Sequence, residues 1–123
     1  IKVSDTESKV ILKKMHDYME HEHAYSNPDL KRSDIAEAIG TSVVKLSQVL
    51  NQQLNESYYA YVNHFRLEEF KRLIDEGEYK RYTVTALSER CGFKRTSFFS
   101  TFRKVEGMTP AEYLKTKNIR TTL

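Results

Sequence analysis

The apolar residues recur every three or four positions along most of the chain, which is the spacing of amphipathic α-helices. The first such stretch begins near Ser4, which has capping-box spacing with Glu7, and it runs to about Glu22. One face of this helix is expected to lie in the core, and it consists of Val10, Ile11, Met15, Tyr18 and Met19. Since no run of residues alternates in the manner of a β-strand, the pattern predicts an all-α fold of about seven helices.

Two short helices with a glycine between them are predicted next. The first covers roughly residues 32–39 and is closed by Gly40, whose freedom at positive φ suits a tight turn. Thr41 or Ser42 then caps a second helix over about residues 43–54. Two short helices joined by a short turn that contains glycine describe a helix-turn-helix.

A longer helix is predicted over residues 58–76, after the capping residue Ser57. Within it, Glu68 and Arg72 have the i,i+4 spacing of a helical ion pair. The sequence therefore predicts two subdomains and a linker. These are a first helix-turn-helix subdomain at residues 1–56, the linker helix at 57–77 and a second helix-turn-helix subdomain at 78–123.

The second subdomain repeats the pattern of the first. It is predicted to hold a helix from Thr83 to Cys91, a helix over residues 95–106 and a last helix that begins at Thr109. Sliding the sequence by 52 positions superposes turn, core and capping positions without a gap. The matched pairs include Gly40 with Gly92, Ile35 with Leu87, Glu37 with Glu89, Leu46 with Phe98, Leu50 with Phe102, and Ser57 with Thr109. This periodicity indicates that one supersecondary unit is used twice.

Charge is distributed unevenly along the 123 residues, although the net charge is only +3. Residues 1–78 hold 10 lysines and arginines against 14 acidic residues, and residues 79–123 hold 10 against 3. A block of cations is often no more than a solvated surface, and it also suits a polyanionic partner. The surrounding pattern has to decide between the two.

Enzyme chemistry has no supporting pattern in this chain. Of the four histidines, His21 and His23 are one residue apart and therefore point in different directions on a helix, and no nearby cysteine completes a metal site. Cys91 occupies a core position before a turn glycine, so a buried structural thiol is expected there. No phosphate-binding glycine loop is present. We therefore expect no catalysis, no metal and no cofactor.

Cellular context can be inferred from a few further features. A single cysteine fits a reducing compartment, and no apolar run has the length of a signal or membrane segment. The expected location is the cytoplasm, with no membrane contact by this chain. Because the sequence begins with isoleucine and not methionine, we expect it to be a piece of a longer protein.

Three stretches of sequence resemble a known family. They are DIAEAIGTSVVKLSQVL (34–50), RLEEFKRLI (66–74) and CGFKRTSFFSTFRKVEGMTPAEYL (91–114). They are similar to the DNA-binding domain of AraC/XylS-type transcription regulators, over nearly the whole chain. The resemblance implies sequence-specific binding of double-stranded DNA for transcription regulation. It also implies two recognition helices, about 43–54 and 95–106, that enter successive major-groove segments.

The same resemblance implies which residues meet DNA. Base contacts are expected from Val43, Val44, Ser47, Gln48, Arg95, Thr96, Phe99 and Ser100. Phosphate contacts are expected from Lys45, Lys94, Arg103 and Lys104. An arginine can read guanine with two hydrogen bonds, an amide can pair with adenine, and an aromatic ring can meet a thymine methyl group. For Phe99 the open alternative is a partly buried aromatic, and for Gln48 it is an ordinary solvent-facing side chain.

Four residues depart from the family pattern. Lys31 and Lys94 stand where a capping Ser or Thr is common, and Phe70 and Ser88 stand where a small alanine is customary. The rival interpretation is a basic helical protein-interaction module that meets an acidic partner. It explains the charge but not the 52-residue repeat. Partners implied by the resemblance, besides DNA, are RNA polymerase and an effector or sensory domain N-terminal to this chain.

Overall fold

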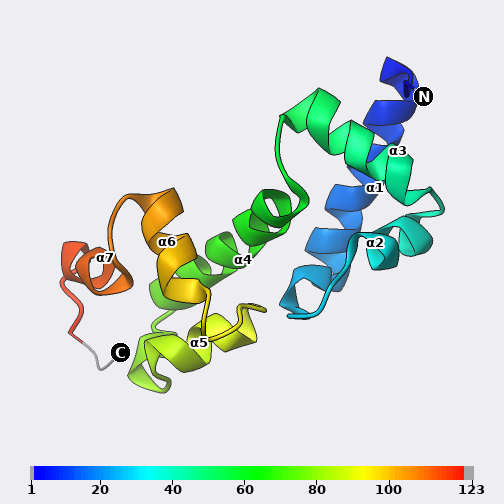
Figure 1. The fold of residues 1–123 in the computed structure, drawn as a ribbon. Helices are drawn as coiled ribbons and strands as arrows, with labels where there is room; N and C mark the ends of the chain where they lie inside the picture. Colours follow the sequence, from blue (N-terminus) through cyan, green and yellow to red (C-terminus); the bar gives the residue numbers. More distant parts are fainter. Residues whose placement is uncertain (1, 121–123) are drawn as a thin grey trace. The chain divides into compact units, whose positions relative to one another are not determined.

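The computed structural model describes residues 2–120, and every regular element within that range is helical, which confirms the predicted fold class (Figure 1). The α-helices are α1 (Asp5–Glu22), α2 (Arg32–Ile39), α3 (Val43–Val49), α4 (Tyr58–Asp75), α5 (Val84–Arg90), α6 (Phe98–Glu106) and α7 (Pro110–Thr116). Two 3₁₀ turns, η1 (Ala24–Ser26) and η3 (Glu78–Lys80), and a π-helical segment, η2 (Leu50–Leu54), complete the set. None of the described helices is both long enough and apolar enough to cross a membrane.

The chain forms two compact units, Ile1–Phe65 and Arg66–Leu123, which we call unit 1 and unit 2. The boundary between them falls inside α4, the helix predicted to link two subdomains. Each unit has its own cluster of buried apolar side chains. The recognition helix of each predicted helix-turn-helix is therefore held by a separate core.

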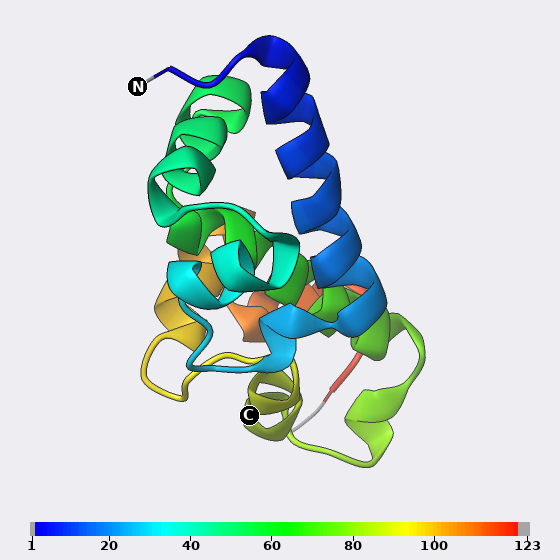
Figure 2. The ribbon, with the colours of Figure 1, turned by 90° about the vertical axis from the view of Figure 1, so that its right-hand side faces the viewer.

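In unit 1, α1 packs against both α2 and α3 (Figure 2). Ile11, Met15 and Met19 are buried because their i,i+4 spacing keeps them on one side of α1. Tyr18 lies partly buried at the edge of the same cluster. Val10 is the exception to the predicted core face, since it is 49% exposed. It follows from helix geometry that adjacent residues point about 100° apart, so Ile11 faces the core and Val10 does not.

Side-chain caps fix the starts of five helices at the positions predicted from the sequence. Each cap oxygen accepts a hydrogen bond from the backbone N–H three residues later: Ser4 from Glu7, Ser42 from Lys45, Ser57 from Ala60, Thr83 from Ala86 and Thr109 from Glu112. Of the two alternatives for α3, the cap is Ser42. At α7 the Glu112 carboxylate also accepts from the Thr109 N–H at 3.0 Å, which completes a capping box and lowers the pKa of that carboxyl.

Unit 2 is built around aromatic rings. The Phe70 and Phe98 ring centroids are 5.0 Å apart, and those of Phe70 and Phe102 are 5.7 Å apart. Phe93 contributes a third ring to Phe98 at 5.2 Å. The two customary alanine positions are thus filled differently: Phe70 extends the ring cluster, and the buried Ser88 donates its hydroxyl to the Thr85 carbonyl oxygen at 2.7 Å.

The start of α6 corrects the predicted range of residues 95–106. Residues 95–97 form a turn, in which the Lys94 carbonyl oxygen accepts hydrogen bonds from the N–H groups of Ser97 and Phe98. The Ser97 hydroxyl donates to the same carbonyl at 3.3 Å. Local hydrogen bonds of this kind compete with helix formation. The helix therefore begins at Phe98, three residues later than predicted.

The ion pairs of α4 also differ from the prediction. Arg72 is held by Glu69, with the guanidinium Nε 2.6 Å from the carboxylate, and by Glu76. Glu68 lies 3.0 Å from the ammonium group of Lys71. Because residues at both i+3 and i+4 are neighbours on a helix surface, the i,i+4 spacing alone does not determine which pair forms.

Candidate nucleic-acid interface

The first predicted reading surface is the solvent side of α3 in unit 1. Ser42 caps the helix, and Leu46 and Val49 are buried, so the first turn faces outward. Val43 is 40% exposed and Val44 is 61% exposed. Two apolar side chains therefore stand in water at the start of this helix, where they can meet the methyl groups of thymines.

The two polar residues predicted to read bases from α3 are less accessible. Ser47 and Gln48 are both half-buried. The Gln48 side-chain oxygen is buried and finds no hydrogen-bond partner among residues 2–120. A buried amide oxygen without a partner is costly, so this group gains from any donor that reaches it.

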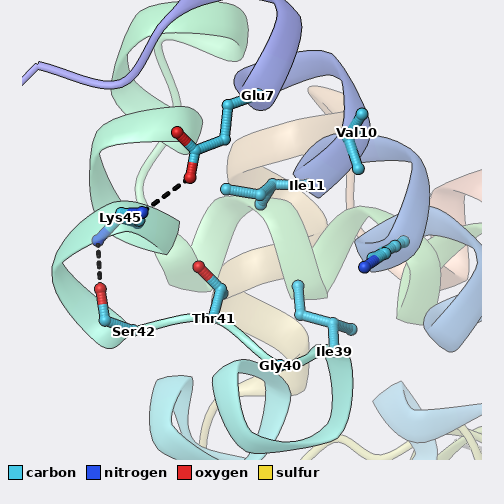
Figure 3. Close-up of a pocket in the computed structure, with 9 residues that line it drawn as sticks. Glu7, Val10, Ile11, Ile39, Gly40, Thr41, Ser42 and Lys45 are labelled. Carbon is cyan, nitrogen blue, oxygen red and sulfur yellow. Dashed lines mark hydrogen bonds and ion pairs between the residues drawn. The ribbon is translucent and has the colours of Figure 1, made fainter.

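Lys45 is predicted to contact phosphate, and the structure gives it a protein partner. Its ammonium nitrogen Nζ lies 2.7 Å from Oε1 of Glu7, which projects from α1 (Figure 3). The pair stands beside a pocket of about 340 Å³ between α1 and the turn that joins α2 to α3. Val10, Thr41 and Gly40 also line this pocket. The cation of α3 is thus neutralised within unit 1.

The end of the first recognition helix is not α-helical. The predicted range of residues 43–54 stays helical throughout, but the bonding changes to the wider π pattern in η2 after Val49. The segment is capped at its C-terminal end by Asn55, which has a left-handed conformation with a φ of 50° and whose N–H donates to the Asn51 carbonyl oxygen. Asn51 and Gln52 are exposed on this segment. Single turns of π-helix occur often at functional sites, which makes this end of the helix a further candidate for the interface.

The second predicted reading surface comprises the turn before α6 and the outer face of α6. Phe98 and Phe102 are fully buried one turn apart, which turns the opposite side of the helix to solvent. Phe99, Ser100, Arg103 and Lys104 are all exposed; Phe99 is 37% exposed, with its ring edge against Phe98. Their i,i+4 spacing makes two adjacent rows on one face. An apolar ring, a hydroxyl and two cations are therefore presented together.

Lys94 directly precedes the turn, Arg95 and Thr96 lie in it, and all three are exposed. The Arg95 Nε donates to Oε1 of Glu89 at 3.2 Å, and Glu89 belongs to α5. This contact engages one edge of the guanidinium. The two terminal nitrogens are the pair that can bind guanine O6 and N7 together. Glu89 thus restricts the directions in which Arg95 can point.

Two acidic residues near the candidate interface, Glu7 and Glu89, were not singled out as site residues by the sequence patterns. Glu7 is 38 positions from Lys45, and Glu89 is six positions from Arg95 across a turn. Neither spacing corresponds to a helical pair, so no rule of periodicity points to them. The only available signal was the 52-residue match of Glu89 with Glu37, which marks a shared position but no function.

Cys91 and the histidines lie apart from this surface chemistry. Cys91 is buried, and burial raises the pKa of its thiol to about 12, so the thiol is protonated at neutral pH. The predicted buried structural thiol is confirmed. His16 shares a 2.9 Å hydrogen bond with the Tyr61 hydroxyl, and burial raises the pKa of that phenol. Across residues 2–120, no three His, Cys, Asp or Glu side chains are grouped so as to hold a metal ion.

Comparison with known proteins adds an independent observation. A family model described as a helix-turn-helix domain matches residues 35–116. An uncharacterized HTH-type transcriptional regulator of Escherichia coli K12, YijO, is 29% identical over 107 residues, which cover 86% of this chain and 36% of that relative. The chain thus spans about a third of the length of this curated relative. No solved structure matches the chain.

Proposed function

Because this chain belongs to the helix-turn-helix family of AraC/XylS-type transcription regulators, we propose that it binds double-stranded DNA sequence-specifically through two recognition helices, α3 and α6. The observation that carries the proposal is the division of α6 into two faces. Phe98 and Phe102 anchor one face in the core of unit 2, and the exposed face carries Phe99, Arg103 and Lys104. A helix that only completed a core would need no such cations.

In unit 2 the proposed contacts combine phosphate binding with base reading. Lys94, Arg103 and Lys104 neutralise phosphates, which contributes affinity for any DNA sequence. Arg95 reads guanine from the turn, and its contact with Glu89 limits the orientations of the guanidinium. Thr96, Phe99 and Ser100 supply the remaining base contacts, with Phe99 meeting a thymine methyl group.

In unit 1 the proposed contacts are nearly all uncharged. Val43 and Val44 meet apolar groups in the major groove, and Ser47 and Gln48 form hydrogen bonds to base edges. The Gln48 side-chain oxygen is buried without a partner, so on this proposal the amide turns outward on binding and accepts from a base amino group such as adenine N6 or cytosine N4. Unit 1 on this proposal reads sequence without contributing much general attraction.

The proposal includes binding of α3 and α6 in successive major-groove segments. α4 has 18 residues, which at about 1.5 Å per residue amount to about 27 Å of helix. Successive major-groove segments on one face of DNA are about 34 Å apart. The helix has a length of the right order to connect two such readers.

The test begins with selection of a preferred duplex from random DNA, followed by mobility shifts against a scrambled duplex and against heparin. We expect the preferred duplex to bind about 10³-fold or more tightly than the scrambled one at physiological salt. Hydroxyl-radical footprints on the preferred site should show two protected segments about one helical turn apart. Protection of one segment alone contradicts the two-reader arrangement. Equal binding of preferred DNA, scrambled DNA and heparin favours the basic protein-interaction module and contradicts the proposed function.

A second part of the proposal concerns the role of the whole protein. We propose that it regulates transcription in the cytoplasm, with RNA polymerase as a partner and with an effector or sensory domain N-terminal to this chain. The support is the relative described above, which is named a transcriptional regulator and is nearly three times as long as the matched region. Copurification of the full-length protein with RNA polymerase on its preferred DNA tests this extension.

A further inference from the structure

The ion pair between Glu7 and Lys45 joins α1 to the first recognition helix. The two charged atoms are 2.7 Å apart, and the side chains are 43% and 42% exposed, so each is partly shielded from water (Figure 3). The backbone of each residue is held by a helix-capping serine. The Glu7 N–H donates to Ser4 and the Lys45 N–H donates to Ser42, which places each side chain at the first turn of a capped helix.

This ion pair compensates the positive charge of the only cation in the first recognition helix. That charge therefore attracts the phosphates of DNA less. Lys45 is the one lysine or arginine in α3 and η2. Residues 1–65, which make up unit 1, hold 7 lysines and arginines against 9 acidic residues, a net charge of −2. With Lys45 neutralised, unit 1 presents apolar and amide groups to DNA and offers little to attract phosphates.

We propose that Glu7 is a specificity-determining residue that acts through Lys45: it holds the lysine away from phosphate and so suppresses sequence-independent binding by unit 1. This inference rests on the proposed function. It differs from the family-based expectation that Lys45 contacts phosphate. In the protein–DNA complex the pair stays closed, and α3 is retained on DNA only where base edges match its side chains.

The size of the expected effect follows from counterion release. One additional phosphate contact steepens the dependence of log K on log salt by about 0.9, which amounts to about eight-fold in affinity for each ten-fold decrease in salt. Glu7→Gln keeps the length of the side chain and releases Lys45. The gain should be largest on a scrambled duplex, because unit 1 has few other contacts there. The ratio of preferred to scrambled affinity should therefore fall.

The experiment measures fluorescence anisotropy on preferred and scrambled duplexes across salt concentrations for four variants and the unchanged chain. Glu7→Gln is compared with Asp17→Asn, which also removes one negative charge from α1 and also releases a lysine, Lys13, from a 3.0 Å pair. Lys45→Met and the double variant Glu7→Gln/Lys45→Met complete the set. Far-ultraviolet circular dichroism and thermal unfolding verify that each variant is folded.

We expect Glu7→Gln to bind scrambled DNA several-fold more tightly with a steeper salt dependence, and Asp17→Asn to change neither quantity comparably. Lys45→Met alone should leave the salt dependence nearly unchanged, and Glu7→Gln should have no further effect once Lys45 is absent. The inference is overturned if Lys45→Met flattens the slope by about 0.9, because the lysine then binds phosphate already. It is also overturned if Glu7→Gln changes the affinity for scrambled DNA and its salt dependence no more than Asp17→Asn does. If the preferred duplex still binds more tightly than the scrambled one in that case, the proposed function stands. If the unchanged chain discriminates no DNA at all, both proposals fail.

Discussion

At the scale of single residues, two polar groups in unit 1 are buried at a cost. The hydroxyl of Ser8 and the side-chain oxygen of Gln48 each lack a hydrogen-bond partner within residues 2–120. Gln48 lies on the face proposed to meet DNA, where a ligand can supply a donor. Ser8 is fully buried on α1, and no contact with DNA is proposed for it that could supply a hydrogen-bond partner. The two residues therefore call for different explanations, and Ser8 offers a test of the packing alone.

Ser8→Ala is expected to stabilise the protein. Burying a hydroxyl group without a hydrogen bond costs about 1 to 3 kcal/mol, and alanine removes the hydroxyl while it leaves the β-carbon in place. We expect the free energy of unfolding to rise by about 1 kcal/mol, measured by urea titration with circular dichroism. Ser33→Ala, at an exposed position of α2, serves as the control for the higher helix propensity of alanine. A gain no larger than that of the control shows that the Ser8 hydroxyl carries no penalty.

Residue-level chemistry was predictable where burial decides it and not where a partner decides it. The position of Cys91 before a turn glycine was sufficient to predict a buried thiol. The partners of Lys45, Arg95 and Arg72 were not predictable, because a long charged side chain can reach several carboxylates and the choice depends on packing. Two of these three belong to the candidate interface, which is why its electrostatics emerged only from the structure.

At the scale of elements, helix starts were predictable where a side chain caps the helix. Ser42, Thr83 and Thr109 each accept a hydrogen bond from a backbone N–H, and each helix begins at the next residue. α6 has no side-chain cap, and its start was misplaced by three residues. The π-helical end of the first recognition helix had no marker either, since its residues also suit an α-helix. Periodicity thus predicts that an element exists, and local hydrogen bonding determines where it begins and ends.

The two faces of α6 lead to a prediction about adjacent phenylalanines. Phe98 is fully buried among other rings, whereas Phe99 is partly exposed. Phe98→Ala should reduce the free energy of unfolding by about 3 to 5 kcal/mol, and Phe98→Leu should cost considerably less because it retains most of the volume. Phe99→Ala should change stability by less than about 1 kcal/mol. Urea denaturation measures all three.

The exposed ring of Phe99 is proposed to contact DNA, so its removal should affect binding. Phe99→Ala is expected to weaken binding to the preferred duplex while the chain stays folded. If Phe99→Ala destabilises as strongly as Phe98→Ala, the ring belongs to the core, which is the alternative that the sequence left open. If it affects neither stability nor binding, Phe99 has no role in the proposed interface.

At the scale of the whole molecule, the unequal charge of the two sequence segments predicts unequal roles. Residues 79–123 carry 10 cations against 3 acids, and in residues 1–78 the one cation of the first recognition helix is paired with Glu7. Counterion release should therefore come mainly from unit 2, and unit 1 should add selectivity. The charge asymmetry was evident from the sequence alone. The ion pair between Glu7 and Lys45, which strengthens this asymmetry, was not evident from the sequence, because it depends on how α1 packs against α3.

This division of roles can be measured with variants that separate affinity from selectivity. Lys104→Ala should weaken binding to every duplex and flatten the slope of log K against log salt by up to about 0.9, and Arg103→Ala should behave alike. Lys9→Ala provides the matched control, since Lys9 is an exposed lysine of α1 and belongs to neither recognition helix. Its slope should stay close to that of the unchanged chain.

Variants of the proposed base readers should form a second group. Arg95→Ala should cost about 1 to 3 kcal/mol on the preferred duplex and relax selectivity at one position, and Gln48→Ala should relax selectivity in the other half of the site. Neither should alter the salt slope as Lys104→Ala does, because a base contact releases few counterions. Fluorescence anisotropy at several salt concentrations, on preferred and scrambled duplexes, distinguishes the two groups. A Gln48→Ala slope as flat as that of Lys104→Ala, or equal weakening of both duplexes by Arg95→Ala, contradicts the division, because affinity and selectivity would then come from the same residues.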